Sequence, residues 1–174
     1  MIIIEEGKLQ FQFPSDWQVC KYDGINHFYY NQVRRCEGTK AVDILAWSGK
    51  ELFMIEAKYF RGDRINNKER ILKGELVAEV TQKVRDTIAG LYGAFRGFNE
   101  ELQPFYRQLL SEKRQSVKIV LLLEEDRPPE RAKSFKYRRS QLQKVLNSHL
   151  KFLSVHCHVH DCSDLPKYFQ WSVK

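Results

Sequence analysis

Residues 41 to 60, AVDILAWSGKELFMIEAKYF, contain two apolar runs that are separated by a Ser-Gly turn. Two such runs joined by a short turn are typical of a β-hairpin. Side chains alternate between the two faces of a strand, so Glu56 and Lys58 share one face of the second run. Burying a charged group costs several kcal/mol unless the group is paired or bound to a metal. These two side chains therefore either face water or serve chemistry.

The length of the hairpin loop decides where Asp43, on the first strand, lies relative to Glu56. With a four-residue loop, Trp47 pairs with Leu52 and Asp43 lies opposite Glu56, with the Cβ atoms about 5 Å apart. With a three-residue loop, Ile55 lies opposite Asp43 and the two carboxylates point to opposite faces of the sheet. Only the four-residue loop brings the carboxylates together.

Two carboxylates that face each other repel unless a positive charge lies between them. Mg²⁺ or Mn²⁺ suits Asp43 and Glu56, because such cations prefer hard oxygen ligands and are often held by one or two carboxylates. The carbonyl of Ala57 can add a further ligand. Lys58, on the same face as Glu56, can polarise a water or neutralise charge on a phosphate in the transition state. A metal and a lysine together are what hydrolysis of a phosphodiester needs.

The segments around the hairpin predict an α/β domain. Upstream, residues 8 to 13 alternate as a strand, and residues 15 to 35 fit either a short helix or a strand. Downstream come a helix, a second helical stretch ending near Lys113, a buried strand at 117–125, a basic helix and a strand at 151–160. The core face of the first of these helices is formed by Val77, Val80, Val84, Ile88, Leu91 and Phe95. This order predicts a mixed central β-sheet flanked by helices. Because no repeat or linker divides the chain, residues 1–174 are expected to form a single domain.

The positive charge of the chain is concentrated in one segment. The whole sequence has 29 basic and 22 acidic residues, and residues 127–151 contain eight of the basic residues and one of the acidic residues. That segment alone therefore carries a net +7, and the remaining residues sum to zero. A concentrated basic segment is typical of a surface that binds a polyanion, although a solvated helix face has the same composition.

The apolar runs, the first residues and the cysteine spacing predict a protein of a reducing compartment. No apolar run approaches the roughly 20 residues needed to span a bilayer, and the start MIIIEEGKLQ lacks the features of a signal peptide. We therefore expect a cytoplasmic protein without a membrane partner. The four cysteines form no CxxC pair, so free thiols are expected.

The hairpin resembles the core motif of the PD-(D/E)xK nuclease superfamily. Asp43, twelve intervening residues and then Glu56-Ala57-Lys58 match that motif, with Val42 in place of its proline. The resemblance covers roughly residues 15–125 and implies a restriction-endonuclease-like fold and metal-dependent cleavage of DNA.

The resemblance also implies roles for particular residues. Asp43 and Glu56 would bind the metal, and Lys58 would be the catalytic lysine. The following helix often supplies a Gln or a basic residue near the scissile phosphate, which matches Gln82 and Lys83. The superfamily also has an acidic residue upstream. The candidates for that residue are Asp23 and Glu37.

Residues outside the hairpin suggest other contacts and sites. In the basic helix, Phe135 and Leu142 are expected to anchor the core, and the candidate phosphate contacts are Lys133, Lys136, Arg138 and Arg139. Three histidines, His156, His158 and His160, share one face of the last strand. Because zinc ligands usually come in separated pairs, an exposed polar face, backed by Cys157 and Val159 in the core, is favoured over a metal site. The aromatic residues 28–30 can stack on bases, but packing in the core is favoured.

Three functions from different classes follow from these features. The leading hypothesis is a magnesium-dependent nuclease that acts on DNA, serving with partner proteins in restriction, repair or defence. The second is a nucleic-acid-binding module that keeps the fold but does not cleave, and the third is a protein-interaction domain that uses the basic helix. A homodimer is plausible because many proteins with this motif act as dimers.

Overall fold

The computed structural model describes residues 1–25, 27–62, 71, 74–110, 116–126 and 132–174. The side chains of residues 132, 133 and 135 also lie outside the described part. The expected phosphate contact Lys133 and the expected core anchor Phe135 therefore fall outside the described side chains. Leu142, the other expected anchor of the basic helix, is buried in the core.

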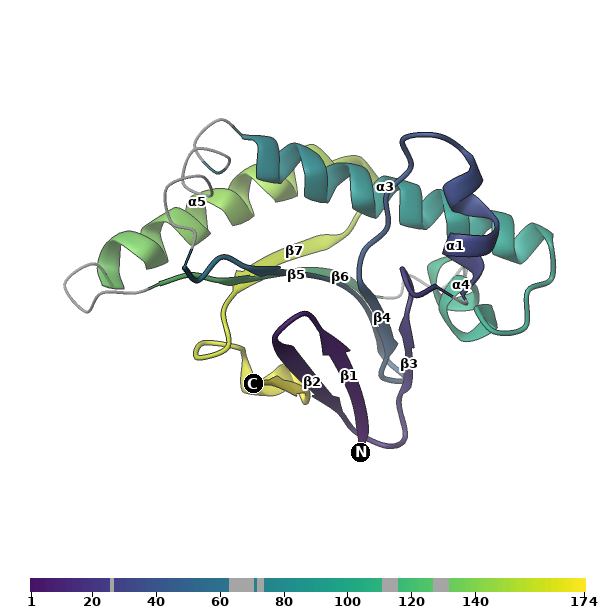
Figure 1. Cartoon of the computed structure of the whole chain (residues 1–174), viewed down its shortest axis with the longest axis horizontal. Coiled ribbons are helices and arrows are strands. Elements are labelled where there is room, and N and C mark those ends of the chain that lie inside the picture. The colour runs from purple at the N-terminus through teal and green to yellow at the C-terminus, as the bar shows by residue number, and fades with distance from the viewer. Residues whose placement is uncertain (26, 63–70, 72–73, 111–115, 127–131) are drawn as a thin grey trace.

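A mixed sheet forms the centre of the protein, as the sequence predicts, and the structure gives it five strands (Figure 1). In spatial order its strands are β3 (Gln18–Lys21), β4 (Ile44–Trp47), β5 (Glu51–Tyr59), β6 (Ser116–Glu124) and β7 (His156–His160). The pairs β3–β4 and β4–β5 are antiparallel, whereas β5–β6 and β6–β7 are parallel. The expected hairpin is confirmed as β4 and β5, and the apolar run at 117–125 is confirmed as a central strand.

Helices cover one face of this sheet. They are α1 (Phe28–Asn31), α3 (Glu75–Arg96), α4 (Gln103–Leu109) and α5 (Ala132–Leu150). The two long helices α3 and α5 lie across the same face of the sheet (Figure 1). The predicted core face of α3 is confirmed along most of its length, but Phe95 is 43% exposed because its ring lies at the helix end, against Tyr106. No helix within the described ranges is long and apolar enough to cross a membrane.

A second, three-stranded sheet covers the other face, in place of further helices (Figure 1). Its antiparallel strands are β1 (Ile2–Glu6), β2 (Leu9–Phe13) and β8 (Ser172–Val173). The predicted strand at 8–13 is thus confirmed. Its alternating pattern buries Leu9, Phe11 and Phe13 against the central sheet, while the intervening glutamines stay partly exposed. The tilted rings of Phe13 and Trp171, 5.6 Å apart, help to fill the space between the sheets.

The alternation of β5 separates two cores and fixes the direction of Glu56. Leu52 and Met54 belong to the core under the helices, whereas Phe53 and Ile55 belong to the core between the two sheets. Glu56 continues the series of Leu52 and Met54, so it faces the helices. The hairpin therefore presents its carboxylate to the underside of α3.

The histidine-rich strand β7 differs from the expected exposed face. Cys157 and Val159 are in the core as predicted, but the imidazoles of His158 and His160 pack edge-on against Phe169, with ring centroids 5.2 and 5.9 Å away. The C-terminal segment covers this face of β7, which a pattern of alternating polarity cannot reveal. Burial, with the nearby side chains of His160 and Lys118, lowers the pKa of His158 to about 4.

We expect His158 to make stability fall under mild acid. Its folded pKa lies below the unfolded value of about 6.5, so the unfolded chain binds the proton more readily. The stabilising contribution is therefore complete above about pH 6.5 and is lost as pH falls towards 4. Between pH 7 and pH 4.5, urea unfolding should show a loss about 1–3 kcal/mol larger for wild type than for His158→Gln. The exposed neighbour His156, changed to Gln, should keep the wild-type dependence. Equal slopes for all three proteins would contradict the assignment.

Candidate active site

The register of the hairpin brings Asp43 and Glu56 together. Trp47 pairs with Leu52 and the ladder continues to Ile44 and Ile55, so the four-residue loop is the one that forms. Beyond the last pair, Lys83 Nζ lies 3.1 Å from Asp43 Oδ1 and 2.8 Å from Glu56, so the two carboxylates share one cation. The predicted juxtaposition of the two carboxylates is therefore confirmed.

Asp43 lies directly before the first residue of β4, beside the part of β5 that extends beyond the β4 pairing. The Asp43 amide donates to the Ile55 carbonyl at 3.1 Å, and the Ala57 amide then donates to Asp43 Oδ2 at 2.7 Å. A side-chain oxygen thus replaces the backbone acceptor that β4 would otherwise have supplied. Because the N–H and C=O of one strand residue point to the same side, the Ala57 carbonyl is directed towards Asp43 as well.

Two lysines hold the buried carboxylates. Lys83, on α3, has its Nζ 2.8 Å from Glu56 and 3.1 Å from Asp43 Oδ1. Lys58 Nζ lies 2.8 Å from Glu56 Oε1 and 2.7 Å from Glu79 Oε1. Glu56 has no exposed surface and Asp43 is 5% exposed, so the solvent-facing alternative for this strand is wrong. The site is a compact network of alternating charges beneath α3.

Burial and like charge act against ionisation of Glu56. Burial, reinforced by the Asp43 carboxylate, raises the pKa of Glu56 to about 7, although Lys83 and Lys58 oppose the shift. Burial alone would lower the pKa of Lys83, but Glu56 and Asp43 outweigh it and raise the pKa. The pKa of Lys58 is also raised, because Glu56 and Glu79 outweigh its burial. Both lysines are therefore cations at neutral pH.

The structure distinguishes between the two upstream acids. Asp23 lies just beyond β3, where the neighbouring Tyr22 amide donates to the Asp43 carbonyl at 2.9 Å. Burial raises the pKa of Asp23 to about 6, with Asp43 and Glu6 adding to the shift. Its Oδ1 is buried and has no hydrogen-bond partner among the described residues. Glu37 is exposed, and no described contact joins it to Asp43. Of the two candidates, Asp23 is therefore the one that senses the charge of Asp43.

Glu79 is the residue that sequence reasoning missed. It precedes Lys83 by four residues on α3, so the two side chains project from the same face of the helix. Its 2.7 Å hydrogen bond from Lys58 ties the helix to the hairpin. The signal was present in the spacing of Glu79 and Lys83, but only the packing of α3 on the sheet shows which strand they face.

Gln82 is not brought into the carboxylate network. Its side-chain amide donates to the Gly38 carbonyl at 2.7 Å. Gln82 and Lys83 are adjacent on α3, and successive helical residues project in directions about 100° apart. Of the two, the structure therefore places Lys83 at the site.

The basic helix α5 offers fewer free cations than its sequence suggests. Arg139 is 7% exposed and pairs with Asp161 and with Asp164, the latter at 2.7 Å. Its predicted role as a phosphate contact is wrong, because two acids that follow β7 hold its guanidinium in the interior. Arg138 forms a 2.9 Å ion pair with Glu125. Lys136 is exposed and keeps its predicted role as a candidate contact.

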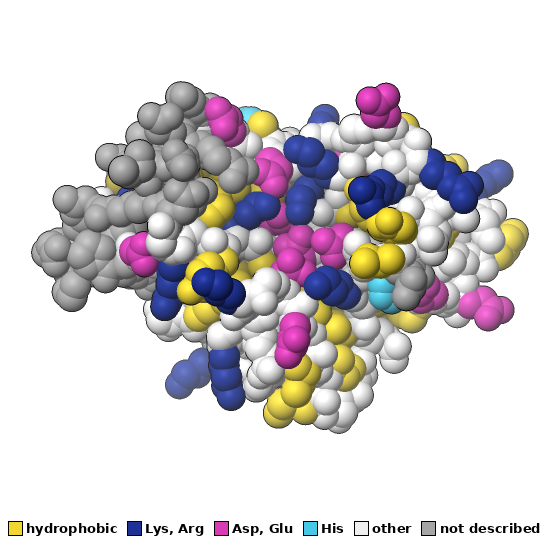
Figure 2. Space-filling model, in the orientation of Figure 1, with side chains coloured by type: hydrophobic (Ala, Val, Ile, Leu, Met, Phe, Trp, Pro, Cys, Tyr) yellow, Lys and Arg dark blue, Asp and Glu magenta, His cyan; other side chains and the backbone are white. Residues whose placement is uncertain are grey.

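Charged side chains are unevenly distributed on the face shown in Figure 2. Acidic side chains gather near its centre, with lysine and arginine side chains around them. Some cations lie over aromatic rings: Lys8 Nζ is 5.1 Å from the Tyr59 centroid, and the Arg34 guanidinium is 4.7 Å from the Tyr30 centroid. Tyr29 is buried against Tyr22, as the core-packing interpretation of residues 28–30 predicts. For Tyr30, which is 38% exposed, that interpretation is wrong. A negative centre with a basic border suits a cation beneath a polyanion.

Comparison with known proteins yields one curated relative. No family model and no solved structure matches the chain. The chain is 31% identical over 150 residues to cysteine–tRNA ligase of Neisseria meningitidis serogroup A / serotype 4A. The match covers 71% of this chain and 21% of the ligase. The chain therefore spans about a fifth of the length of that relative.

Proposed function

We propose that the protein is a metal-dependent nuclease that hydrolyses phosphodiester bonds in DNA. The observation that carries the proposal is the contact of Asp43 and Glu56 with one ammonium group, that of Lys83, with Lys58 beside Glu56. These are the three residues that match the PD-(D/E)xK motif. The mixed sheet, with α3 following the hairpin and packed over it, supports a restriction-endonuclease-like fold.

The oxygen atoms at the site fit a hard divalent cation. Lys83 Nζ lies between the Asp43 and Glu56 carboxylates, which shows that their arrangement favours a positive charge. The buried Oδ1 of Asp23 and the Ala57 carbonyl are further oxygen donors. Mg²⁺ or Mn²⁺ held by these groups would supply an activated water and neutralise charge on the phosphate.

The lysines determine what the protein itself contributes. Since its pKa is raised, Lys58 stays protonated and serves as a charge and a hydrogen-bond donor rather than as a general base. Glu79 and Glu56 fix its ammonium group between strand and helix. From this position Lys58 can donate to a phosphate oxygen and stabilise the charge that develops in the transition state. Lys83 would supply a second cation for the phosphate once it is displaced from the carboxylates.

A cleavage assay tests the proposal. Linear, circular and single-stranded DNA are incubated with the protein in Mg²⁺, in Mn²⁺ and in EDTA, and products are separated by electrophoresis. Cutting that requires the metal is the expected result. Transfer RNA belongs in the same panel, because the name of the curated relative refers to a tRNA ligase. Cutting of RNA alone would change the substrate class but retain the chemistry.

The ammonium of Lys83 also favours a second candidate, a nucleic-acid-binding module without cleavage. This ammonium group already neutralises Asp43 and Glu56. A site that cleaves DNA would have to replace the ammonium group with a metal ion. Binding by such a module would weaken steeply with salt and would need no metal. No cleavage in any metal, together with salt-sensitive DNA binding, would select this second candidate. The interaction domain built on α5 is less favoured, because internal acids already hold Arg138 and Arg139.

Lys83→Met should make the stability of the protein depend on magnesium. Without the Lys83 ammonium group, Asp43 loses its ion pair and Glu56 keeps only Lys58, so a divalent cation between the two carboxylates becomes more favourable. At Mg²⁺ concentrations tenfold above Kd, we expect the thermal midpoint of this variant to rise by about 3–6 °C. Lys50→Met, on the exposed hairpin loop, is the matched control and should show the small wild-type shift. Equal shifts in the two variants would argue against a cation site between the carboxylates.

A further inference from the structure

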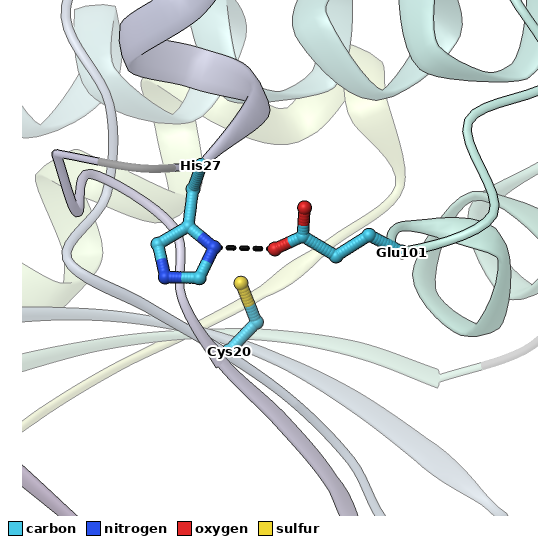
Figure 3. A group of neighbouring side chains, drawn as sticks. All are labelled: Cys20, His27 and Glu101. Carbon is cyan, nitrogen blue, oxygen red and sulfur yellow. Dashed lines mark hydrogen bonds and ion pairs between the residues drawn. The ribbon is translucent and has the colours of Figure 1, made fainter.

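A second group of metal-ligating side chains lies apart from the lysine-held carboxylates. Cys20 comes from β3, His27 directly precedes α1, and Glu101 lies in the turn between α3 and α4. One ligand atom from each lies within 4.8 Å of the others. Figure 3 shows the Cys20 sulfur pointing towards the gap between the imidazole and the carboxylate, with His27 Nδ1 paired to Glu101. Three separate segments of the chain thus converge on one point.

The backbone fixes the orientation of the imidazole. Gly24 packs so closely on His27 that a Cβ at residue 24 would lie 2.5 Å from Cδ2 and 3.2 Å from Nε2. The Nε2 side of the ring is therefore held against the loop, and Nδ1 is the nitrogen directed at Glu101. Any side chain at residue 24 would push the ring away from this position.

Glu101 is held on an ordered turn. The Asn99 amide donates to the Ala94 carbonyl at 2.9 Å, which closes the end of α3. The side chain of Asn99 then accepts from the Leu102 amide at 2.9 Å, at the start of α4. Glu101 lies inside this closed turn, so its carboxylate is presented from a fixed backbone.

We propose that Cys20, His27 and Glu101 bind a zinc ion. Sulfur, imidazole nitrogen and carboxylate oxygen are the donors that Zn²⁺ takes, whereas Mg²⁺ prefers oxygen alone. Zinc lies about 2.0–2.3 Å from such donors, so tetrahedral ligands are separated by roughly 3.3–3.8 Å. The ligand atoms now lie within 4.8 Å of one another, and the His27–Glu101 contact is shorter than the spacing that zinc requires. Rotation of the Cys20 and Glu101 side chains would bring the sulfur closer and move the carboxylate away from Nδ1. Water would complete the four ligands.

Zinc binding would change the protonation of Cys20 and the partner of Glu101. Burial, with the carboxylates of Glu101 and Asp23, raises the pKa of Cys20 to about 12, so the metal-free group is a thiol. The Zn–S bond would form as the S–H bond breaks, and the proton would leave to solvent. Glu101 would exchange its contact with His27 Nδ1 for a bond to zinc, and any proton on that nitrogen would also leave to solvent as Nδ1 binds the metal.

The zinc would act as a structural clamp. Cys20, in β3, and His27, directly before α1, flank the loop that carries Asp23, and Glu101 lies beyond the end of α3. Joining the three would fix this loop against the helix that carries Lys83. The zinc site itself does not depend on the proposed nuclease activity, because none of its ligands belongs to the hairpin.

Metal analysis of the purified protein tests the proposal. After dialysis against a chelator and reloading, wild type should hold one zinc per chain, and Cys20→Ala and Glu101→Gln should bind zinc at least about a hundredfold more weakly. Zinc at a hundredfold excess over Kd should raise the thermal midpoint of wild type by about 5–10 °C. The same concentration of Mg²⁺ should not reproduce that shift.

Matched variants separate the site from other thiols and from the hairpin. Cys36→Ala removes an exposed free cysteine, and His149→Gln removes an exposed imidazole; both should bind zinc as wild type does. Glu101 is itself partly exposed, so Glu101→Gln tests the site without disturbing the core. Glu56→Gln should retain zinc even if DNA cleavage is lost. Zinc binding that is equal in wild type, Cys20→Ala and Glu101→Gln, or absent from all three, would overturn the proposal.

Discussion

Glu56→Gln is expected to reduce metal-dependent DNA cleavage by on the order of a thousandfold or more. The change keeps the shape of the side chain and removes the charge that a divalent cation requires. Glu56 is fully buried with a pKa near 7, so the fold already accommodates a neutral group at this position. The variant should therefore fold normally, and its loss of activity would report on chemistry rather than on stability. Single-turnover cleavage in Mg²⁺ gives the comparison directly.

Glu51→Gln provides the matched control on the same strand. Glu51 begins β5 and pairs with Lys118 at 2.5 Å, in a partly exposed ion pair. Removing a pair of this kind typically costs less than about 1 kcal/mol, so cleavage should stay close to wild type. Asp43→Asn should behave like Glu56→Gln, because both carboxylates contact Lys83. Wild-type cleavage rates in both site variants would remove the basis of the nuclease assignment.

Arg139→Ala should lower the free energy of unfolding by about 3–5 kcal/mol. Its guanidinium faces Asp161, which has no exposed surface, and also contacts Asp164 at 2.7 Å. Truncation removes the cation that compensates the buried Asp161 carboxylate. The uncompensated charge then destabilises the folded state. For a chain of this size the thermal midpoint should drop by roughly 6–20 °C.

Lys136→Ala is the control for the basic helix. Lys136 lies one turn before Arg139 on α5 and is exposed, so its removal should change stability by no more than about 0.5 kcal/mol. The two variants should also differ in DNA binding. Lys136→Ala should weaken binding, whereas any effect of Arg139→Ala should follow its loss of stability. A fully stable Arg139→Ala protein with reduced DNA affinity would restore the original surface interpretation of Arg139.

The hairpin could be predicted from sequence because its signals are local. Alternation of side chains and a short Ser-Gly turn together limit the register to two choices, and in the four-residue one Asp43 faces Glu56. The burial of Val77, Val80 and Val84 on α3 follows in the same way from a period of three and four residues. Patterns of this kind decide which face of an element is buried.

Local patterns do not decide what a buried face meets. Arg139 is one of eight basic residues in its segment. Only its ion pairs with Asp161 and Asp164, which follow the next strand, distinguish it from its neighbours. Glu79 and Lys83 are likewise ordinary helix residues until α3 packs on the hairpin. The group of Cys20, His27 and Glu101 spans 81 positions of sequence, without the short ligand spacings that mark common zinc sites. Each of these is a tertiary contact between distant segments.

The pairing of β2 with β8 has a consequence for the order in which the protein can assemble. The backbones of Gln10 and Lys174 exchange hydrogen bonds of 2.9 and 3.0 Å across a separation of 164 positions. On the ribosome, all five strands of the central sheet have emerged before Phe169 and Trp171 can cover Phe53. Loop closure over such a span is slow. Until these residues follow, Phe53 lacks the Phe169 and Trp171 rings that pack on it in the folded protein, and an exposed aromatic surface of this kind favours aggregation.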